Sequence, residues 1–432
     1  MHALAEEDHK TIPDGWEEKT IGSLCHIWSG GTPSKSEPSF WQGDIPWVSG
    51  KDLKAPTLSD SIDHISPEGL RAACRLAPTG AVFLLVRGMG LAKDLPISVA
   101  NRPMAFNQDI KALVSRTALS GSFIRSAVYH AKDRLMSRIV PSAHGTMTLN
   151  LDDVENISIL VPGKHEECDA IASVLDLAQS AILAERRLLD TTAEFKRSAM
   201  RELFTHGLHG EAQKETEIGR LPESWDVLPL SEVAAIERGR FLHRPRNEPR
   251  FYGGSTPFVQ TGDVVRSAGR IRVFSQSLND DGVAISRVFP AGTILITIAA
   301  NIGYTGILQF ASACPDSLVA ITPIAGIDNA FLEYFLQTQQ REMDRRAPKG
   351  TQKNINIQFL NPWPVPVPTL DEQCEIVAIL DAIDRKIDLH MRKRAVLEDL
   401  FKALLHKLMI GEIRVADLDL SALSSASGAR AA

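Results

Sequence analysis

Arginine is concentrated in one short part of this chain, between residues 238 and 272. Only two acidic residues, Glu248 and Asp263, lie among these arginines, although the 432-residue chain carries a formal net charge of −6. A guanidinium is a planar fork of donors that suits phosphate oxygens and guanine edges. The segment therefore predicts a local anion-binding surface, and the alternative is a solvated basic loop without a ligand. Its arginines are Arg238, Arg240, Arg244, Arg246, Arg250, Arg266, Arg270 and Arg272.

Other basic residues are more scattered, and for them an ordinary surface position is an equally good interpretation. Lys349 and Lys353 flank Gly350-Thr351, a pair that also occurs earlier as Gly145-Thr146. The remaining candidates for anion contacts all lie in the first quarter of the chain: Lys35, Lys51, Lys54, Arg87 and Lys93.

No pattern in the sequence predicts catalysis or a resident metal. Asn361-Pro362-Trp363-Pro364 is only superficially similar to the base-gripping loop of amino-methyltransferases, and no Gly-rich loop follows a strand to receive a cofactor. His206 and His209 lack nearby Cys or acidic ligands. The chain therefore reads as a binding protein without catalytic, metal or cofactor residues of its own.

The elements that position these residues occur twice. Residues 12–16, Ile-Pro-Asp-Gly-Trp, return at 221–225 as Leu-Pro-Glu-Ser-Trp, and residues 45–48, Ile-Pro-Trp-Val, return at 256–259 as Thr-Pro-Phe-Val. A repeat of this length is a whole domain rather than a solenoid unit. Two similar domains on one chain predict two similar tasks.

Each half reads as a mixed α/β stretch that ends in a long helix. Short apolar runs at 80–86, 157–161, 293–299 and 364–367, bounded by Gly or Pro, predict core strands. No Pro or Gly interrupts 166–206 or 371–410, and Gly207 and Gly411 are placed as C-terminal caps. At 1.5 Å per residue, each helix predicts a rod of about 60 Å.

Apolar residues on both helices repeat with heptad spacing, which is typical of a coiled-coil seam. A seam this long needs a partner, and the other helix of the same chain is the economical one. We expect the two helices to pair antiparallel; the alternative is two separate core helices. The expected pairing residues are Leu175, Ile182, Leu189, Leu203, Ile376, Leu380, Ile383, Ile387, Leu397, Phe401, Leu404 and Leu408.

The expected fold class is α+β, with two similar globular mixed α/β domains separated by an antiparallel pair of long coiled-coil helices. The domains are placed at 1–162 and 208–368, the helices at 163–207 and 369–412, and a flexible tail at 413–432. Residues 207–219 are expected to link the halves.

Three motifs carry a resemblance to a known family. The segment Thr205-His206-Gly207, with the 213–225 segment after it, is the first. The second is Glu372-Gln373, followed by 376–381 (Ile-Val-Ala-Ile-Leu-Asp), and the third is the ending 404–413. Together they resemble the specificity subunits of type I restriction–modification systems over residues 12–415. Glu166-Glu167 departs from the usual Glu-Gln of that pattern.

The resemblance implies two target recognition domains, each of which reads half of a split, asymmetric DNA site. It implies that the helices set the gap between the halves and dock two methyltransferase subunits, and that restriction/translocase subunits complete the complex. S-adenosylmethionine, ATP and Mg would then be used by those partners, while this chain binds double-stranded DNA and no cofactor.

Composition favours the reducing cytoplasm. The five cysteines are scattered and form no Cys-x-x-Cys, the N-terminus lacks a signal sequence, and no apolar run could span a membrane. Two other functions stay open: a coiled-coil scaffold or DNA-binding adaptor outside restriction, and a self-contained DNA methyltransferase or nuclease.

Overall fold

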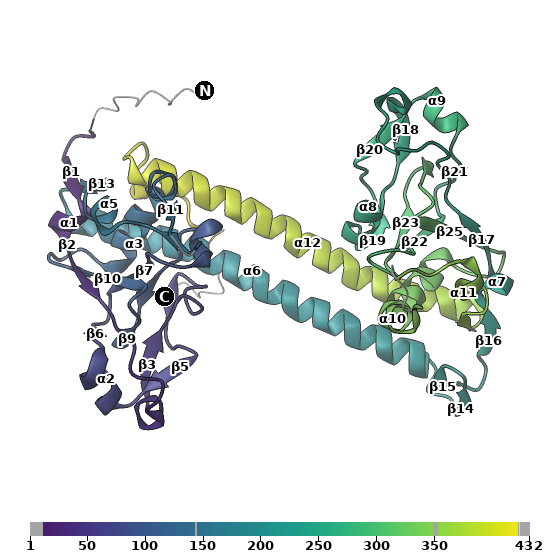
Figure 1. Ribbon diagram of the computed structural model, residues 1–432, viewed down its shortest axis with the longest axis horizontal. Coiled ribbons are helices and arrows are strands. Elements are labelled where there is room, and N and C mark those ends of the chain that lie inside the picture. The colour runs from purple at the N-terminus through teal and green to yellow at the C-terminus, as the bar shows by residue number, and fades with distance from the viewer. Residues whose placement is uncertain (1–11, 143–144, 349–352, 422, 424–432) are drawn as a thin grey trace. The chain divides into compact units, whose positions relative to one another are not determined.

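The computed structural model describes residues 12–142, 145–348, 353–421 and 423, and the chain divides into two units (Figure 1). The first unit comprises the described residues up to Leu188 together with those from His390 onward. The second unit is the continuous stretch Leu189–Leu389. Each long helix therefore contributes one half to each unit.

The first unit is built on a five-stranded sheet, ordered β2-β10-β7-β8-β4, and a four-stranded sheet, ordered β5-β3-β9-β6. Their strands are β2 (Cys25–Ser29), β3 (Ile45–Val48), β4 (Thr57–Leu58), β5 (Asp63–Ile65), β6 (Leu76–Ala77), β7 (Val82–Leu85), β8 (Ile97–Ala100), β9 (Met104–Phe106) and β10 (Ile110–Ser115). Two smaller antiparallel pairs join β1 (Trp16–Thr20) to β13 (Ser158–Pro162) and β11 (Val140–Pro141) to β12 (Met147–Thr148). The strands expected at 80–86 and 157–161 are β7 and β13.

Short helices complete this unit, and α3 packs against β7 and β8 over the main core. Its N-cap Ser120 accepts a hydrogen bond from the Phe123 amide, which satisfies one of the free donors of the first turn. The helices are α1 (Ile21–Leu24), α2 (Pro67–Ala73), α3 (Gly121–His130), α4 (Lys132–Met136) and α5 (Leu151–Glu155), with the 3-10 turns η1 (Pro38–Trp41) and η2 (Met89–Ala92).

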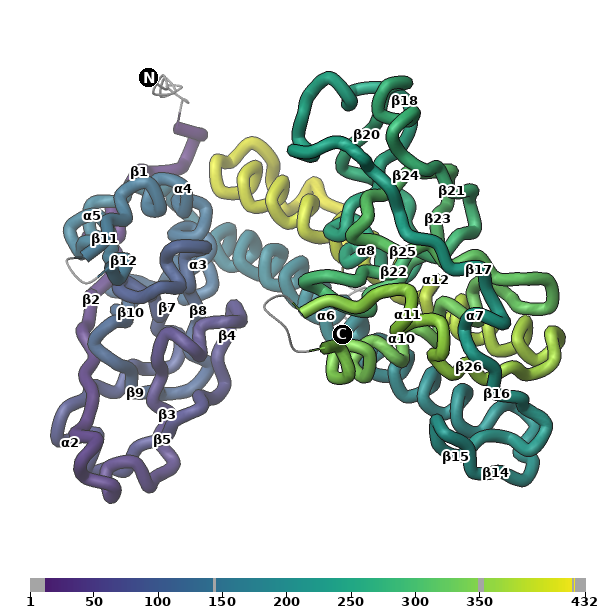
Figure 2. The backbone as a smooth tube through the Cα atoms, turned by 45° about the vertical axis from the view of Figure 1, so that its right-hand side comes forward, coloured from purple at the N-terminus to yellow at the C-terminus, as the bar shows by residue number. Residues whose placement is uncertain are grey.

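The second unit repeats the strand order of both main sheets, most of whose strands are labelled in Figure 2, whereas the β11–β12 pair has no named counterpart among its described strands. Its sheets are ordered β17-β25-β22-β23-β19 and β20-β18-β24-β21, and β16 pairs with β26 as β1 does with β13. The strands are β16 (Asp226–Pro229), β17 (Ala234–Arg238), β18 (Tyr252–Phe258), β19 (Gly269–Ile271), β20 (Gln276–Leu278), β21 (Val288–Phe289), β22 (Ile294–Thr297), β23 (Thr305–Leu308), β24 (Ser312–Ala313), β25 (Leu318–Pro323) and β26 (Pro364–Val367).

All but one of the short helices of the second unit occupy the same places in the chain order as helices of the first unit, the exception being residues 261–266. They are α7 (Leu230–Val233), η3 (Pro249–Phe251), α8 (Thr261–Arg266), α9 (Asp280–Ala284), α10 (Asn329–Arg346) and α11 (Ile357–Leu360); a last turn, η4 (Val415–Asp417), belongs to the first unit. The internal repeat seen in the sequence is therefore a repeat of fold.

The segment expected to link the halves is more ordered than its polar composition indicates. Residues Gln213–Thr216 form β14 and pair antiparallel with β15 (Gly219–Pro222). Thr216 donates a hydrogen bond from its hydroxyl to the Gly219 carbonyl at 2.7 Å, which closes the hairpin turn. The sequence predicted a short linker here, and its composition does not show the strand pairing or this side-chain bond.

The two long helices are α6 (His165–His206) and α12 (Leu370–Met409). Each ends at a glycine with positive φ, Gly207 at 64° and Gly411 at 70°, a conformation that glycine adopts without steric cost. At Gly207 a Cβ atom would also lie within 3.1 Å of the Pro222 ring. Among the described residues, no helix is both long and apolar enough to cross a membrane.

Within each unit the helix halves pack together in antiparallel fashion. In the first unit the early part of α6 shares a core with the late part of α12, and in the second unit the late part of α6 shares a core with the early part of α12. Of the expected pairing residues, Ile182, Leu189 and Ile387 are half-buried. The others are buried: Leu175, Leu203, Ile376, Leu380, Ile383, Leu397, Phe401, Leu404 and Leu408.

Polar contacts join the helices in both units. In the first, the buried carboxylate of Glu185 on α6 lies 2.6 Å from His390 Nδ1 and 2.6 Å from Lys393 Nζ on α12. Burial opposes ionisation of Glu185, but its bonds to Lys393 and His390 outweigh this and lower its pKa. In the second, Lys196 Nζ lies 2.7 Å from Asp384.

Candidate nucleic-acid interface

The arginine-rich segment begins at the end of β17 and runs through β18 and α8 to the residue after β19. Its start is pressed against the 314–317 loop, where the Arg240 amide donates to the Cys314 carbonyl at 2.9 Å. A Cβ atom on Gly239 would lie 2.2 Å from the Pro315 carbonyl oxygen, so only glycine permits this close approach. The glycine thus fixes where the arginines on either side of it emerge.

One residue, Asp316, holds three of these arginines, two through its carboxylate and one through its backbone carbonyl. Arg238 Nε donates to the Asp316 carbonyl at 2.7 Å, Arg244 Nη2 lies 2.8 Å from Asp316 Oδ2, and Arg246 forms an ion pair with Oδ1 of the same residue. The side chains of Arg244 and Arg246 stay 50% and 39% exposed. Because a single carboxylate cannot neutralise these guanidiniums, the loop keeps a net positive charge toward solvent.

A cluster of buried aromatic side chains packs against this loop. Phe241, Phe251 and Phe258 are buried together, with the Phe241 and Phe258 ring centroids 5.3 Å apart. Tyr252 joins them and donates its hydroxyl to the Arg246 carbonyl. Arg250 lies over the Phe251 ring at 4.5 Å, while Arg240 Nη2 donates to the Ser286 carbonyl at 2.9 Å. The arginines are thus carried by a packed base rather than by a free loop.

Arg266 and Arg272 lie further along the same unit and are exposed. Arg266 ends α8 and pairs at 2.8 Å with Asp263, whose other oxygen accepts from the Gln260 amide in a capping box. Val273 and Phe274, next to Arg272, are exposed apolar residues. These positions combine charge with accessible apolar surface.

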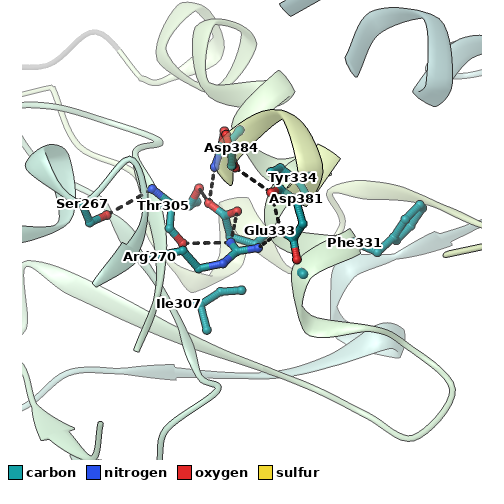
Figure 3. A network of polar contacts seen from close by, with 12 residues as sticks. Ser267, Arg270, Thr305, Ile307, Phe331, Glu333, Tyr334, Asp381 and Asp384 are labelled. Atoms are coloured by element: carbon teal, nitrogen blue, oxygen red, sulfur yellow. Dashed lines mark hydrogen bonds and ion pairs between the residues drawn. The ribbon is translucent and has the colours of Figure 1, made fainter. Parts of the chain in front are cut away.

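Arg270 has a different environment from the other seven arginines (Figure 3). Its guanidinium lies 3.2 Å from Glu333 on α10 and 2.9 Å from Asp381 on α12, and its side chain is only 16% exposed. Both ends of the fork are occupied inside the unit, so Arg270, expected from the sequence to bind an external anion, is held by internal carboxylates instead.

The network around Arg270 is continuous. Glu333 is fully buried and also accepts hydrogen bonds from Thr305 at 3.0 Å and Gln337 at 2.6 Å. The Tyr334 hydroxyl donates to Asp381 and Asp384, and Lys196 pairs with Asp384 (Figure 3). Burial raises the pKa of both Glu333 and Tyr334. Burial alone would lower the pKa of Arg270, but the neighbouring acidic groups, Glu333 first and then Tyr334, Asp381 and Asp384, together outweigh it and raise that pKa.

In the first unit, an aspartate of α6 equivalent to Asp381 pairs with an arginine of the globular part. Asp176 follows Leu175 as Asp381 follows Leu380, and it lies 2.9 Å from Arg125 on α3. Arg125 also donates to Gln179. The arginine comes from α3 in one unit and from β19 in the other, but both meet the same position of the long helix.

The loop that carries the arginines has a neutral counterpart in the first unit. The Gly31 amide donates to the Phe106 carbonyl at 2.9 Å, as Arg240 does to Cys314. Gln108 therefore takes the place of Asp316, and its Oε1 accepts a hydrogen bond from Thr32 at 2.5 Å. The two units present the same loop with different side chains.

A second pair of equivalent positions also differs. Arg75, just before β6, lies over the half-buried ring of Trp28 at 5.9 Å. Arg287, just before β21, pairs instead with Glu237, which takes the place of Trp28 in its edge strand. Neither Arg75 nor Asp316 was among the sequence-based candidates. Aligning the two halves residue by residue is the signal that could have found them.

The scattered basic candidates are divided between the two units. Lys35, Lys54, Arg87 and Lys93 are exposed in the first unit, and Lys51 pairs with Asp63 at 2.7 Å. In the second unit Lys353 pairs with Asp344 at 2.7 Å. Lys349 lies outside the described residues. Within the described ranges, no group of three or more His, Cys, Asp or Glu residues is placed to hold a metal ion.

Comparison with known proteins assigns this architecture. The model of the type I restriction modification DNA specificity domain matches the chain twice, at residues 13–190 and 222–399. The chain belongs to this family. The two matches correspond to the two topological repeats, each with a recognition fold and most of a long helix.

Relatives and solved structures agree with this membership. The MjaIX specificity subunit of Methanocaldococcus jannaschii is 22% identical over 445 residues, covering 96% of this chain and 97% of that protein. The EcoR124I/EcoR124II specificity subunit of Escherichia coli is 32% identical over 165 residues, covering 37% of this chain and 40% of the relative. The crystal structure of the S subunit from M. genitalium superposes with a TM-score of 0.61 at 15% identity, covering 94% and 98% of the two chains.

Proposed function

We propose that this chain is the DNA-recognition subunit of a type I restriction–modification complex and that it reads a two-part, asymmetric DNA site. The observation that carries the proposal is the pair of units that share the strand order of both main sheets but differ in the chemistry of their equivalent loops. One loop holds arginines around Asp316, and the other holds Thr32 and Gln108. Two units of similar fold with different side chains on equivalent loops are suited to reading two different half-sites.

Exposed arginines and lysines bind phosphates and set the register on the duplex, which makes affinity depend on salt. In the second unit this role falls to Arg238, Arg244 and Arg246, which face solvent on a packed base. Base edges are read by neighbouring polar side chains, for which arginine forks and glutamine amides are well suited. Gln108 in the first unit and Arg240 in the second are the first residues to test.

The antiparallel helices hold the two recognition units at a fixed spacing and dock two methyltransferase subunits, with restriction/translocase subunits completing the complex. Exposed apolar side chains on the helices, among them Phe195, Val396 and Leu400, are available for such contacts. Methyl transfer from S-adenosylmethionine and ATP-driven, Mg-dependent cleavage belong to those partners, and the complex acts in the cytoplasm.

The test is single-molecule mapping of methylated adenines in a host that expresses this chain with the methyltransferase subunit encoded beside it. A host that expresses the methyltransferase subunit alone is the control. We expect a new motif made of two short defined halves separated by a fixed gap. Methylation without such a motif, or an identical motif in the control host, would contradict the proposal.

A further inference from the structure

A basic groove on the second unit is separate from the arginine loop. It has a volume of about 580 Å³ and lies between the end of α6, the β14–β15 hairpin and the middle of α10. Four arginines line it: Arg197, Arg201, Arg220 and Arg341. No acidic residue is among the described residues that line it. Such a concentration of one charge on a chain with net charge −6 predicts an anionic ligand.

Two of these arginines have no internal carboxylate. Arg220 pairs with Glu215 at 2.6 Å, and Arg197 lies 3.9 Å from Glu194. Arg201 and Arg341 are exposed, and no carboxylate within the described part of the chain lies within 4.0 Å of either. Their guanidiniums are therefore available to a ligand carboxylate, which they can bind through two parallel hydrogen bonds.

The floor of the groove is apolar. Met200 and Phe204 of α6, Leu221 of the hairpin and Phe335 of α10 are buried members of the second-unit core and line the floor. A DNA backbone would leave this floor unfilled, whereas an apolar side chain of a peptide would cover it. The arginines at the rim of the groove and the apolar residues of its floor together fit an acidic peptide segment that carries at least one large apolar residue.

The first unit lacks this charge pattern. Asp133 follows the N-cap Ser120 by as many residues as Arg341 follows the N-cap Asp328, so the two positions are equivalent. The buried residues Leu135 and Met343 also match in this alignment. An acidic partner segment would be repelled by Asp133. The arginine that lines the groove at position 341 is thus not repeated in the first unit.

We propose that this groove binds an acidic segment of the methyltransferase subunit, with an apolar side chain on the Phe204–Phe335 floor. This inference rests on the proposed function, because that function supplies the partner. It adds that the two repeats do not dock their methyltransferase copies in the same way: the second repeat adds a salt-sensitive contact that the first does not make.

The experiment measures the affinity of the full chain for the methyltransferase subunit encoded beside it, and separately for a random-sequence duplex. The test variant is Arg201→Glu with Arg341→Glu. The control is Arg71→Glu with Arg102→Glu, which changes two exposed arginines of the first unit and shifts the net charge equally. We expect the test variant to weaken methyltransferase binding by about tenfold or more and to reduce its salt dependence, with duplex binding no weaker than in the control.

Equal methyltransferase affinity in the test and control variants would overturn the inference. So would a selective loss of duplex binding in the test variant, because the groove would then contact DNA. If the unaltered chain binds neither methyltransferase nor duplex, the proposed function itself fails, and this outcome is distinct from a failure of the groove. A variant with Arg201→Lys and Arg341→Lys keeps the charge without the fork and should retain part of the binding.

Discussion

A single acidic residue, Asp316, decides how the arginine loop presents its charge. It accepts from Arg244 and Arg246 through its carboxylate and from Arg238 through its carbonyl. Such a shared partner orients guanidiniums in advance without cancelling their charge, so less conformational entropy is lost when phosphates bind. The same loop in the first unit relies on neutral hydrogen bonding between Thr32 and Gln108.

Replacing Arg244 and Arg246 together by alanine should weaken duplex binding and lower the slope of log K against log salt by about 1–2 units. The measurement is fluorescence anisotropy over a range of salt concentrations. Arg345 and Arg346 form a matched control, because they also share one carboxylate, Glu342, in the same unit. An unchanged slope in the test variant would exclude this loop from phosphate contact.

Arg270→Met should destabilise the second unit by about 3–5 kcal/mol, because it leaves Glu333 buried without its positive partner. Burial raises the pKa of Glu333, so protonation at low pH favours the folded state, and this contribution is lost as the pH rises through that raised pKa. The cost of the substitution should therefore be largest at neutral pH and shrink toward pH 5. Urea unfolding at several pH values measures it, and a cost independent of pH would contradict this account.

Arg270 also shows where sequence reasoning stops at this scale. Its type and its neighbours made it an anion-binding candidate like the arginines around it. Its partners, Glu333 and Asp381, lie far along the chain, and only the pairing of β19 with β23 and the packing of α10 bring them together. Charge density in a sequence window cannot distinguish a guanidinium that faces solvent from one enclosed by distant carboxylates.

At the scale of elements, α6 and α12 were the most predictable parts of the chain. Their limits follow from local features: uninterrupted helix-forming residues, heptad spacing and a terminal glycine with positive φ. The sheets were less predictable, because strand partners such as β2 and β10 are distant in sequence. Short apolar runs located β7, β13, β22 and β26 but could not give their order in a sheet.

Leu380→Ala on α12 should lower the free energy of unfolding of the second unit by about 2–5 kcal/mol, because it opens a cavity under a fully buried side chain. Leu389→Ala is the matched control on the same helix, since Leu389 is 58% exposed and should change the value by no more than about 0.5 kcal/mol. Chemical denaturation followed by tryptophan fluorescence reports both. Similar losses for the two variants would argue against the antiparallel seam.

At the scale of the whole molecule, the same strand order of the main sheets occurs in both units, but equivalent positions carry different side chains. Equivalent positions carry Gln108 and Asp316, Trp28 and Glu237, Asp133 and Arg341. Both units retain the strand order of the main sheets and the loop contact that requires glycine. Both also retain an aspartate of a long helix that pairs with an arginine of the globular part. What is kept supports the fold, and what differs lies at exposed loops and the groove, as expected where two copies have acquired separate tasks.

Gln108→Ala and Arg240→Ala should each relax a different half of the methylated DNA motif. The reason is that these residues lie on equivalent loops of two independent recognition units. Mapping methylated adenines for each variant beside the unaltered chain tests this. If both substitutions degrade the same half, the assignment of one half-site to each unit is wrong.

The first unit is interrupted in sequence, because it needs residues up to Leu188 and then those from His390 onward, whereas the second unit is continuous. During synthesis on the ribosome, the apolar stripe of Ile171, Leu175 and Ala178 therefore emerges long before the residues around Leu397–Leu408 that share its core. The whole second unit is made in the interval. The core of the first unit can therefore be completed only after the second unit has been synthesised.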